Sequence, residues 1–145
     1  MTGKQPVRLL PESEDALVLR TDFSDDDTWE AIRDEVGMPV GVLGFRANVR
    51  FVDDRAYDSV PTEEVPGLFR AGSSHSFVII ADRVTMTHPD HALLVLDLLE
   101  EAAGGEFRAV PSAVQSIENN LSIGNMDFDD FATAAGGDGV FRGFD

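Results

Sequence analysis

The fold class follows most directly from the stretch Ser76-Phe77-Val78-Ile79-Ile80-Ala81. Such a continuous apolar run indicates a strand that is buried on both faces, as the central strands of α/β sheets are. A second run of this kind lies in the expected strand Ala16–Asp22, which contains Leu17-Val18-Leu19. The segment between the two runs contains one helical pattern, one strand pattern and a second helical pattern, so the chain begins as β-α-β-α-β.

Patterns further out along the chain predict the remaining elements. Two more strands are expected, with the pair Gly104-Gly105 as the turn of a hairpin between them. Two helices follow, and a tail returns to the body of the protein through Phe141 and Phe144. The expected elements beside the two central strands are a helix capped by Ser24 or Asp25 and ending at Gly37, a strand over Ala47–Asp53, a helix over Thr62–Arg70, strands over Leu93–Leu99 and Glu106–Val110, a helix over Pro111–Leu121, and a helix capped by Asn125 or Asp127.

Together these elements predict an α/β (or α+β) protein with one domain. We expect a mixed sheet of about five strands with an antiparallel extension and two C-terminal helices. Residues 1–15 are polar and are expected to form a flexible lead-in, and residues 16–145 the single globular domain. A chain of 145 residues is long enough to bury one core of its own.

The charge balance is the strongest global feature of the sequence. Asp and Glu number 27 against 11 Lys and Arg, which gives a net charge of −16. Such a field repels nucleic acids and anionic membranes and favours basic protein partners or cations, although an acidic surface also serves solubility alone. The chain has no cysteine, its N-terminus has no apolar signal region, and its apolar runs are too short to span a bilayer. We therefore expect a cytoplasmic protein that binds neither nucleic acid nor membrane.

Acidic residues stand where the expected strands end. Asp22 ends the first strand, Asp53 and Asp54 the second, and Asp82 the third. If these strands are parallel, the carboxylates gather at one sheet edge, where Mg²⁺ or Ca²⁺ could bind to hard oxygen ligands. His88 and His91 could assist such a metal site. The alternative is that the aspartates only cap helices and stabilise turns.

One stretch near the C-terminus mixes amides, acids and apolar residues. Its candidate partner-binding residues are Asn119, Asn120, Asn125, Asp127 and Phe128. Apolar anchors ringed by acids suit the recognition of a basic protein. The stretch also suits a tight corner between two helices, because asparagine satisfies loop peptide groups, and the two roles are compatible.

One resemblance to a known family rests on the stretches Arg20–Asp26, Phe51–Asp54, Thr87–His91, Glu118–Ile123 with Asn125–Phe128, and Asp138–Phe144. These stretches resemble an uncharacterised actinobacterial family, the domain-of-unknown-function family numbered 6924. The resemblance covers nearly all of Leu17 to Phe144. It implies a single-domain bacterial protein and transfers no activity and no catalytic residues.

Two functional hypotheses follow from the sequence. The preferred one is a non-enzymatic interaction module, of inhibitor or immunity type, that binds a basic protein and needs no cofactor. It rests on the net charge and on the lack of a nucleophile elbow or a phosphate-binding glycine loop. The alternative is a small enzyme or binding domain that depends on a divalent cation, Mg²⁺ or Ca²⁺, held by the strand-end carboxylates.

Overall fold

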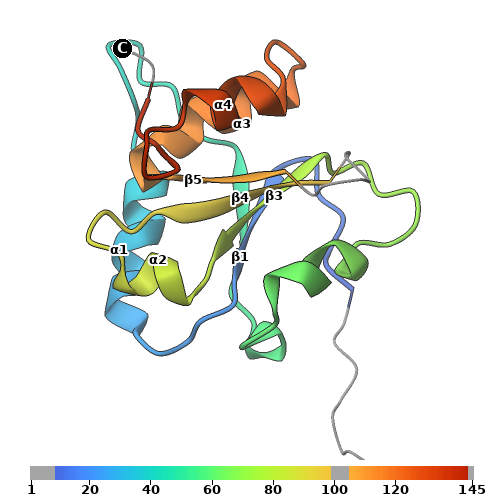
Figure 1. Ribbon diagram of the computed structural model, residues 1–145. Coiled ribbons are helices and arrows are strands. Elements are labelled where there is room, and N and C mark those ends of the chain that lie inside the picture. Colours follow the sequence, from blue (N-terminus) through green and yellow to red (C-terminus); the bar gives the residue numbers. More distant parts are fainter. Residues whose placement is uncertain (1–8, 99–104, 144–145) are drawn as a thin grey trace, which may run out of the picture.

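The computed structural model describes residues 9–98 and 105–143, and at its centre lies one mixed β-sheet (Figure 1). The strand order is β2-β1-β3-β4-β5-β6. Strands β2, β1 and β3 run parallel, β4 is antiparallel to both its neighbours, and β6 runs parallel to β5. The strands are β1 Ala16–Arg20, β2 Val49–Val52, β3 Phe77–Ala81, β4 Leu93–Asp97, β5 Glu106–Ala109 and β6 Val140–Phe141.

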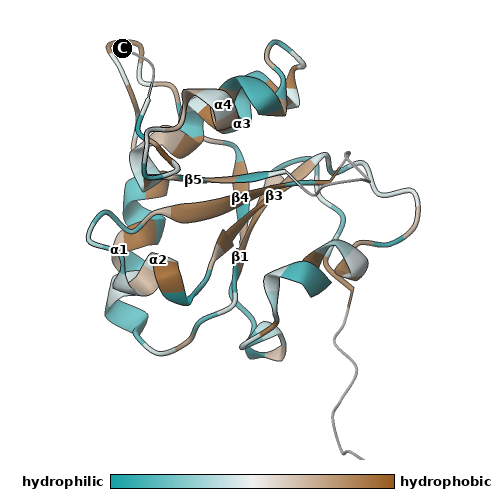
Figure 2. Ribbon diagram, in the orientation of Figure 1, coloured by the Kyte–Doolittle hydropathy of each residue, from teal (hydrophilic) through white to brown (hydrophobic). Residues whose placement is uncertain are grey.

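Apolar side chains cover both faces of this sheet. Every residue of β1 and β3 is buried, as their continuous apolar runs predict, and the strands stand out brown in Figure 2. Successive side chains of a strand point to opposite faces. Val18 and Ile79 therefore pack towards the α-helices, whereas Leu17 and Ile80 pack towards the 3₁₀ helices of the opposite face.

The first face is covered mainly by the α-helices α1 (Asp26–Val36), α3 (Val114–Ser122) and α4 (Phe128–Ala134). Helix α1 begins after Asp25, whose carboxylate accepts a hydrogen bond from the Thr28 backbone N–H, as an N-cap does. The predicted apolar positions of α1 are buried, and the helix ends at Gly37. The second face carries two 3₁₀ helices, η1 (Arg55–Tyr57) and η2 (Thr62–Leu68), together with the buried side chain of Leu10. A further 3₁₀ helix, η3 (Pro111–Ala113), leads into α3.

The structure corrects three details of the expected element order. The sheet has six strands, because the two-residue strand β6 is too short to show a pattern in the sequence. The helix predicted over Thr62–Arg70 is the 3₁₀ helix η2, which starts after Pro61 without a side-chain cap and contains Pro66. A short helix, α2 (Arg83–Thr87), was not among the expected elements, and Asp82 is its N-cap.

The β-α-β start, the antiparallel extension and the C-terminal helix pair are confirmed. Strands β4 and β5 form the predicted antiparallel pair, but Gly104 of the predicted hairpin turn lies outside the described residues, as do Leu99 and Phe144. Residues 1–8 of the predicted lead-in also lie outside them. In the part of the lead-in that is described, the Leu10 backbone N–H donates to the Leu68 carbonyl. Within the described ranges, no helix has both the length and the apolar character needed to cross a membrane.

Candidate functional site

The carboxyl ends of the three parallel strands meet at one edge of the sheet. Asp22 follows β1, Asp53 and Asp54 follow β2, and Asp82 follows β3, so the predicted gathering of strand ends is present. The side chains are not equivalent, however. Each carboxylate has its own set of hydrogen-bond donors, and these donors determine which chemical role each carboxylate can take.

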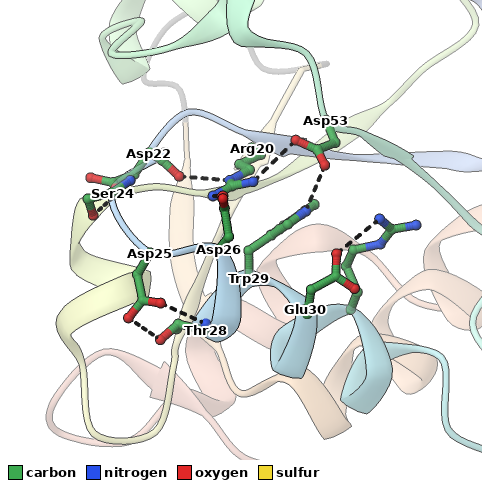
Figure 3. A network of polar contacts seen from close by, with 10 residues as sticks. Arg20, Asp22, Ser24, Asp25, Asp26, Thr28, Trp29, Glu30 and Asp53 are labelled. Carbon is green, nitrogen blue, oxygen red and sulfur yellow. Dashed lines mark hydrogen bonds and ion pairs between the residues drawn. The ribbon is translucent and has the colours of Figure 1, made fainter.

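Arg20, the last residue of β1, organises the middle of this edge (Figure 3). Its side chain is only 3% exposed. One terminal nitrogen lies 2.7 Å from Asp26 Oδ1, and the other lies 3.3 Å from Asp53 Oδ1. The Nε–H donates to the carbonyl of Asp22 at 2.9 Å, and the guanidinium lies 4.3 Å from the centre of the Phe23 ring. One buried cation therefore ties β1, β2 and the start of α1 together.

Trp29 completes this network from α1. Its indole Nε1–H donates to Asp53 Oδ2 at 3.2 Å, and the Arg20 guanidinium lies 5.3 Å from its ring. Asp53 thus accepts hydrogen bonds on both oxygens, one from a cation and one from a neutral donor. The sequence offered one indication of this network, an arginine at the end of an otherwise apolar strand, but its partners were not predicted.

A recess of about 370 Å³ opens beside the network. Three carboxylates line it, from Asp26, Glu30 and Asp53, together with the rings of Phe23 and Trp29. Arg20 and Arg55 also contribute to the lining, and the Arg55 guanidinium lies 5.1 Å from the centre of the Phe23 ring. The recess therefore has three carboxylates against two guanidinium groups, and this excess of negative charge suits a cationic side chain.

The neighbouring acids act mainly as caps. Asp22 accepts hydrogen bonds from the backbone N–H and the hydroxyl of Ser24. The hydroxyl and the backbone N–H of Thr28 donate to Asp25 and hold the pKa of that carboxyl below its ordinary value. Asp54 accepts from the Ala56 backbone N–H at the start of η1. These contacts are the cap and turn roles that the sequence left open as the alternative.

Asp82 lies further along the same edge and forms a separate pair with Arg108 of β5. Both terminal nitrogens of Arg108 donate to the carboxylate, at 2.9 and 2.8 Å, while the same carboxylate caps α2 through Thr85. Burial raises the pKa of Asp82, but the hydrogen bonds from Arg108 and Thr85 lower it more, so the pKa lies below its ordinary value. Asp82 is therefore held as an anion in a fixed geometry.

The two predicted histidines lie beyond α2. His88 Nδ1 accepts a hydrogen bond from the Asp90 backbone N–H at 2.9 Å. His91 Nδ1 lies 3.2 Å from the Thr85 carbonyl, and the backbone of His91 is left-handed, with φ of 51°. Both rings thus make local hydrogen bonds that shape the turn before β4.

In residues 9–98 and 105–143, no three His, Asp or Glu side chains form a group that could hold a metal ion. The predicted ligands Asp22, Asp53 and Asp82 instead accept hydrogen bonds from the protein. A site for Mg²⁺ or Ca²⁺ stays a prediction, and it would require these hydrogen bonds to be exchanged for bonds to metal.

The asparagine-rich stretch forms the predicted corner between α3 and α4. The Asn120 carbonyl accepts from the backbone N–H groups of Asn125 and Met126, and the Asn125 side chain donates to that of Asn120. Asp127 is the N-cap of α4, and the Phe128 ring packs 5.0 Å from that of Phe107. Asn119 donates to the Arg46 carbonyl. The predicted partner-binding residues therefore make internal contacts, and their role in partner binding stays a prediction.

A sequence profile of one protein family matches residues 15–144. The chain belongs to this family, which is described as a domain of unknown function (DUF6924). The match covers all six strands and the three long helices, including Arg20, Asp26, Trp29 and Asp53. Among proteins with curated descriptions, none matches the chain. Membership of the family assigns no activity to the chain.

Proposed function

We propose that this protein is a non-enzymatic interaction module that binds a basic protein, in the manner of an inhibitor or an immunity protein that covers a basic surface. The contact that we assign to this role is the acid-lined recess at the carboxyl edge of the sheet. The observation that carries the proposal is the excess of carboxylates in this recess, where Asp26, Glu30 and Asp53 face two arginines.

The rest of the chain supports this choice of partner. The net charge of −16 draws a basic protein towards the surface from a distance, and the recess supplies short-range contacts once the two meet. Arg20 holds Asp26 and Asp53 in place before binding, so little side-chain freedom has to be lost when a cation enters. The Glu30 side chain is exposed, and among the described residues its one ion pair is a weak contact, 3.8 Å, to Arg33. Its charge is therefore available to a partner.

The test uses nona-arginine as the basic probe and the double variant Asp26→Asn/Glu30→Gln. The matched control is Glu63→Gln/Glu64→Gln, which removes the same charge from exposed positions in the first turn of η2. Isothermal titration calorimetry should show binding by the wild type that weakens as salt is raised from 50 to 300 mM, because salt screens exposed charges beyond about 10 Å. We expect the recess variant to bind about tenfold more weakly and the control variant within about twofold of the wild type.

An equal loss of affinity for nona-arginine in both double variants would mean that the probe responds to net charge alone. The recess would then not be the binding site. A tight interaction that does not depend on salt would refute the charge-based recognition itself. Trp29, the only tryptophan in the chain, reports on the recess independently, because its indole forms part of the lining. Its fluorescence should change on binding in the wild type.

A further inference from the structure

A second surface, of different chemistry, lies at the other end of β2. Residues 38–46 form a protruding loop, which we call the apolar tip. Val40 and Phe45 close it by two backbone hydrogen bonds of 2.7 and 3.0 Å, and its turn uses Gly41 and Gly44 at positive φ. Four of the seven large apolar side chains that are exposed in the described ranges belong to this tip: Met38, Val42, Leu43 and Phe45.

The extent of this exposure distinguishes the tip from an ordinary surface loop. Val42 is fully exposed at 104%, and Leu43 is 79% exposed. Scattered apolar residues on a surface need no explanation, but several on one short loop mark a contact surface. The loop is also held firmly at its base, because the buried carboxylate of Glu118 accepts from the Asn48 backbone N–H and Asn119 donates to the Arg46 carbonyl.

Strand β2, which follows the tip, is an edge of the sheet. It pairs only with β1 among the described strands, so one side of its backbone has no ladder. Phe51 is half-buried against Trp29, and Arg50 is exposed in the middle of the strand. An open edge with these side chains can accept an extended segment of another protein as an additional strand.

The arginines show which charge such a segment should carry. Six of the nine described arginines have a carboxylate within 4.0 Å, namely Arg20, Arg33, Arg70, Arg83, Arg108 and Arg142. Within the described ranges, Arg46, Arg50 and Arg55 have none. In a chain with 27 acidic residues, the described arginines that lack an acidic partner therefore cluster before, within and after one edge strand.

We propose that the apolar tip and the β2 edge together form a docking surface for an extended acidic segment of a partner protein, which adds to the sheet beside β2. Successive side chains of the added segment would point to opposite faces of the sheet. Acidic side chains on the Arg50 face would pair with Arg46 and Arg50, and apolar side chains on the Phe51 face would extend the contact with the helical layer. The tip would cover one end of the added strand.

The probe for this proposal is an eight-residue peptide of alternating glutamate and valine, with a lysine–valine peptide as its counterpart. Amide chemical shifts of the ¹⁵N-labelled protein locate binding. We expect the glutamate peptide to shift the amides of β2 and of the tip, and Arg50→Gln to weaken binding about fivefold, whereas Arg83→Gln, at an exposed arginine elsewhere, should leave it unchanged. Leu43→Ser should weaken binding more than Ile123→Ser, a matched change at a side chain that is 76% exposed.

Several results would overturn the proposal. If the lysine–valine peptide bound as tightly as the glutamate–valine peptide, the segment would not be selected by its negative charge. If the amide chemical shifts changed only in other elements, the β2 edge would not be the binding site. An Arg50→Gln variant that aggregates but binds the glutamate peptide as the wild type does would show that Arg50 only protects the edge from pairing. Sedimentation that reveals a dimer with β2 amides already paired would make a second copy of the chain the occupant. The recess variant Asp26→Asn/Glu30→Gln should bind the glutamate peptide normally, which separates this surface from the proposed function.

Discussion

Replacing Arg20 by methionine should destabilise the protein more than any exposed arginine replacement does. Methionine keeps most of the apolar stem between Phe23 and Trp29 but removes three hydrogen bonds, to Asp26, Asp53 and the Asp22 carbonyl. A hydrogen bond that involves a charged group contributes about 1.5–3 kcal/mol, and removing one partner of a buried ion pair costs more than removing both. Asp26 is well exposed and regains water, so the main loss falls on Asp53 and the Asp22 carbonyl.

We therefore expect Arg20→Met to lower the free energy of unfolding by about 2–3 kcal/mol, which is about 6–12 °C in Tm for a domain of this size. Urea unfolding followed by the fluorescence of Trp29 measures the change, and the heat-induced transition measures the shift in Tm. The control is Arg83→Met, whose guanidinium is 79% exposed and 4.0 Å from Asp22, and which should cost about 0.5 kcal/mol or less.

A double-mutant cycle of Arg20→Met with Asp53→Asn then measures the interaction free energy between these two side chains. Since the two side chains share a hydrogen bond, their effects should not be additive, with a coupling of about 1 kcal/mol. An unfolding free energy of Arg20→Met within about 0.5 kcal/mol of the control variant would refute the view that Arg20 joins β1, β2 and α1.

Three further predictions concern other parts of the chain. The pKa of Asp82 is lowered in the folded protein, so its contribution to stability is present above the ordinary aspartate pKa and is lost as the pH falls through the folded value. Arg108→Gln should consequently cost about 2 kcal/mol at pH 7, and urea unfolding should show this difference shrinking towards pH 2. In thermal unfolding, Mg²⁺ and Ca²⁺ should raise Tm equally, in the wild type and in Asp22→Asn/Asp82→Asn, because both carboxylates already accept protein hydrogen bonds. A rise of about 5 °C or more with one ion, lost in the double variant, would instead establish the strand-end cation site. Gly41→Ala should destabilise the protein by about 1 kcal/mol, since Gly41 has φ of 76°, and an unchanged Tm would show that the tip tolerates another turn.

Local patterns in the sequence were sufficient for much of the fold. The continuous apolar runs at residues 17–19 of β1 and 77–81 of β3 predict strands that are buried on both faces. Helix α1 has an aspartate cap, acids in its first turn and apolar residues at helical spacing, all within 12 residues. The corner between α3 and α4 was predictable for the same reason, because its asparagines bond to neighbours in the chain.

The contacts that define the candidate site depended on the tertiary structure. Arg20 and Asp53 are 33 residues apart, and Asp82 and Arg108 are 26 apart, so no local pattern links them. They meet because β2 pairs with β1 and because β4 lies between β3 and β5, and long-range strand pairing of this kind is not encoded in any short window. The sequence by itself determined which segments are buried and that acids follow the strands. Only the packed sheet decided that a buried arginine ties those acids together. It also decided that, within residues 9–98 and 105–143, the three arginines without an acidic partner lie around one open edge.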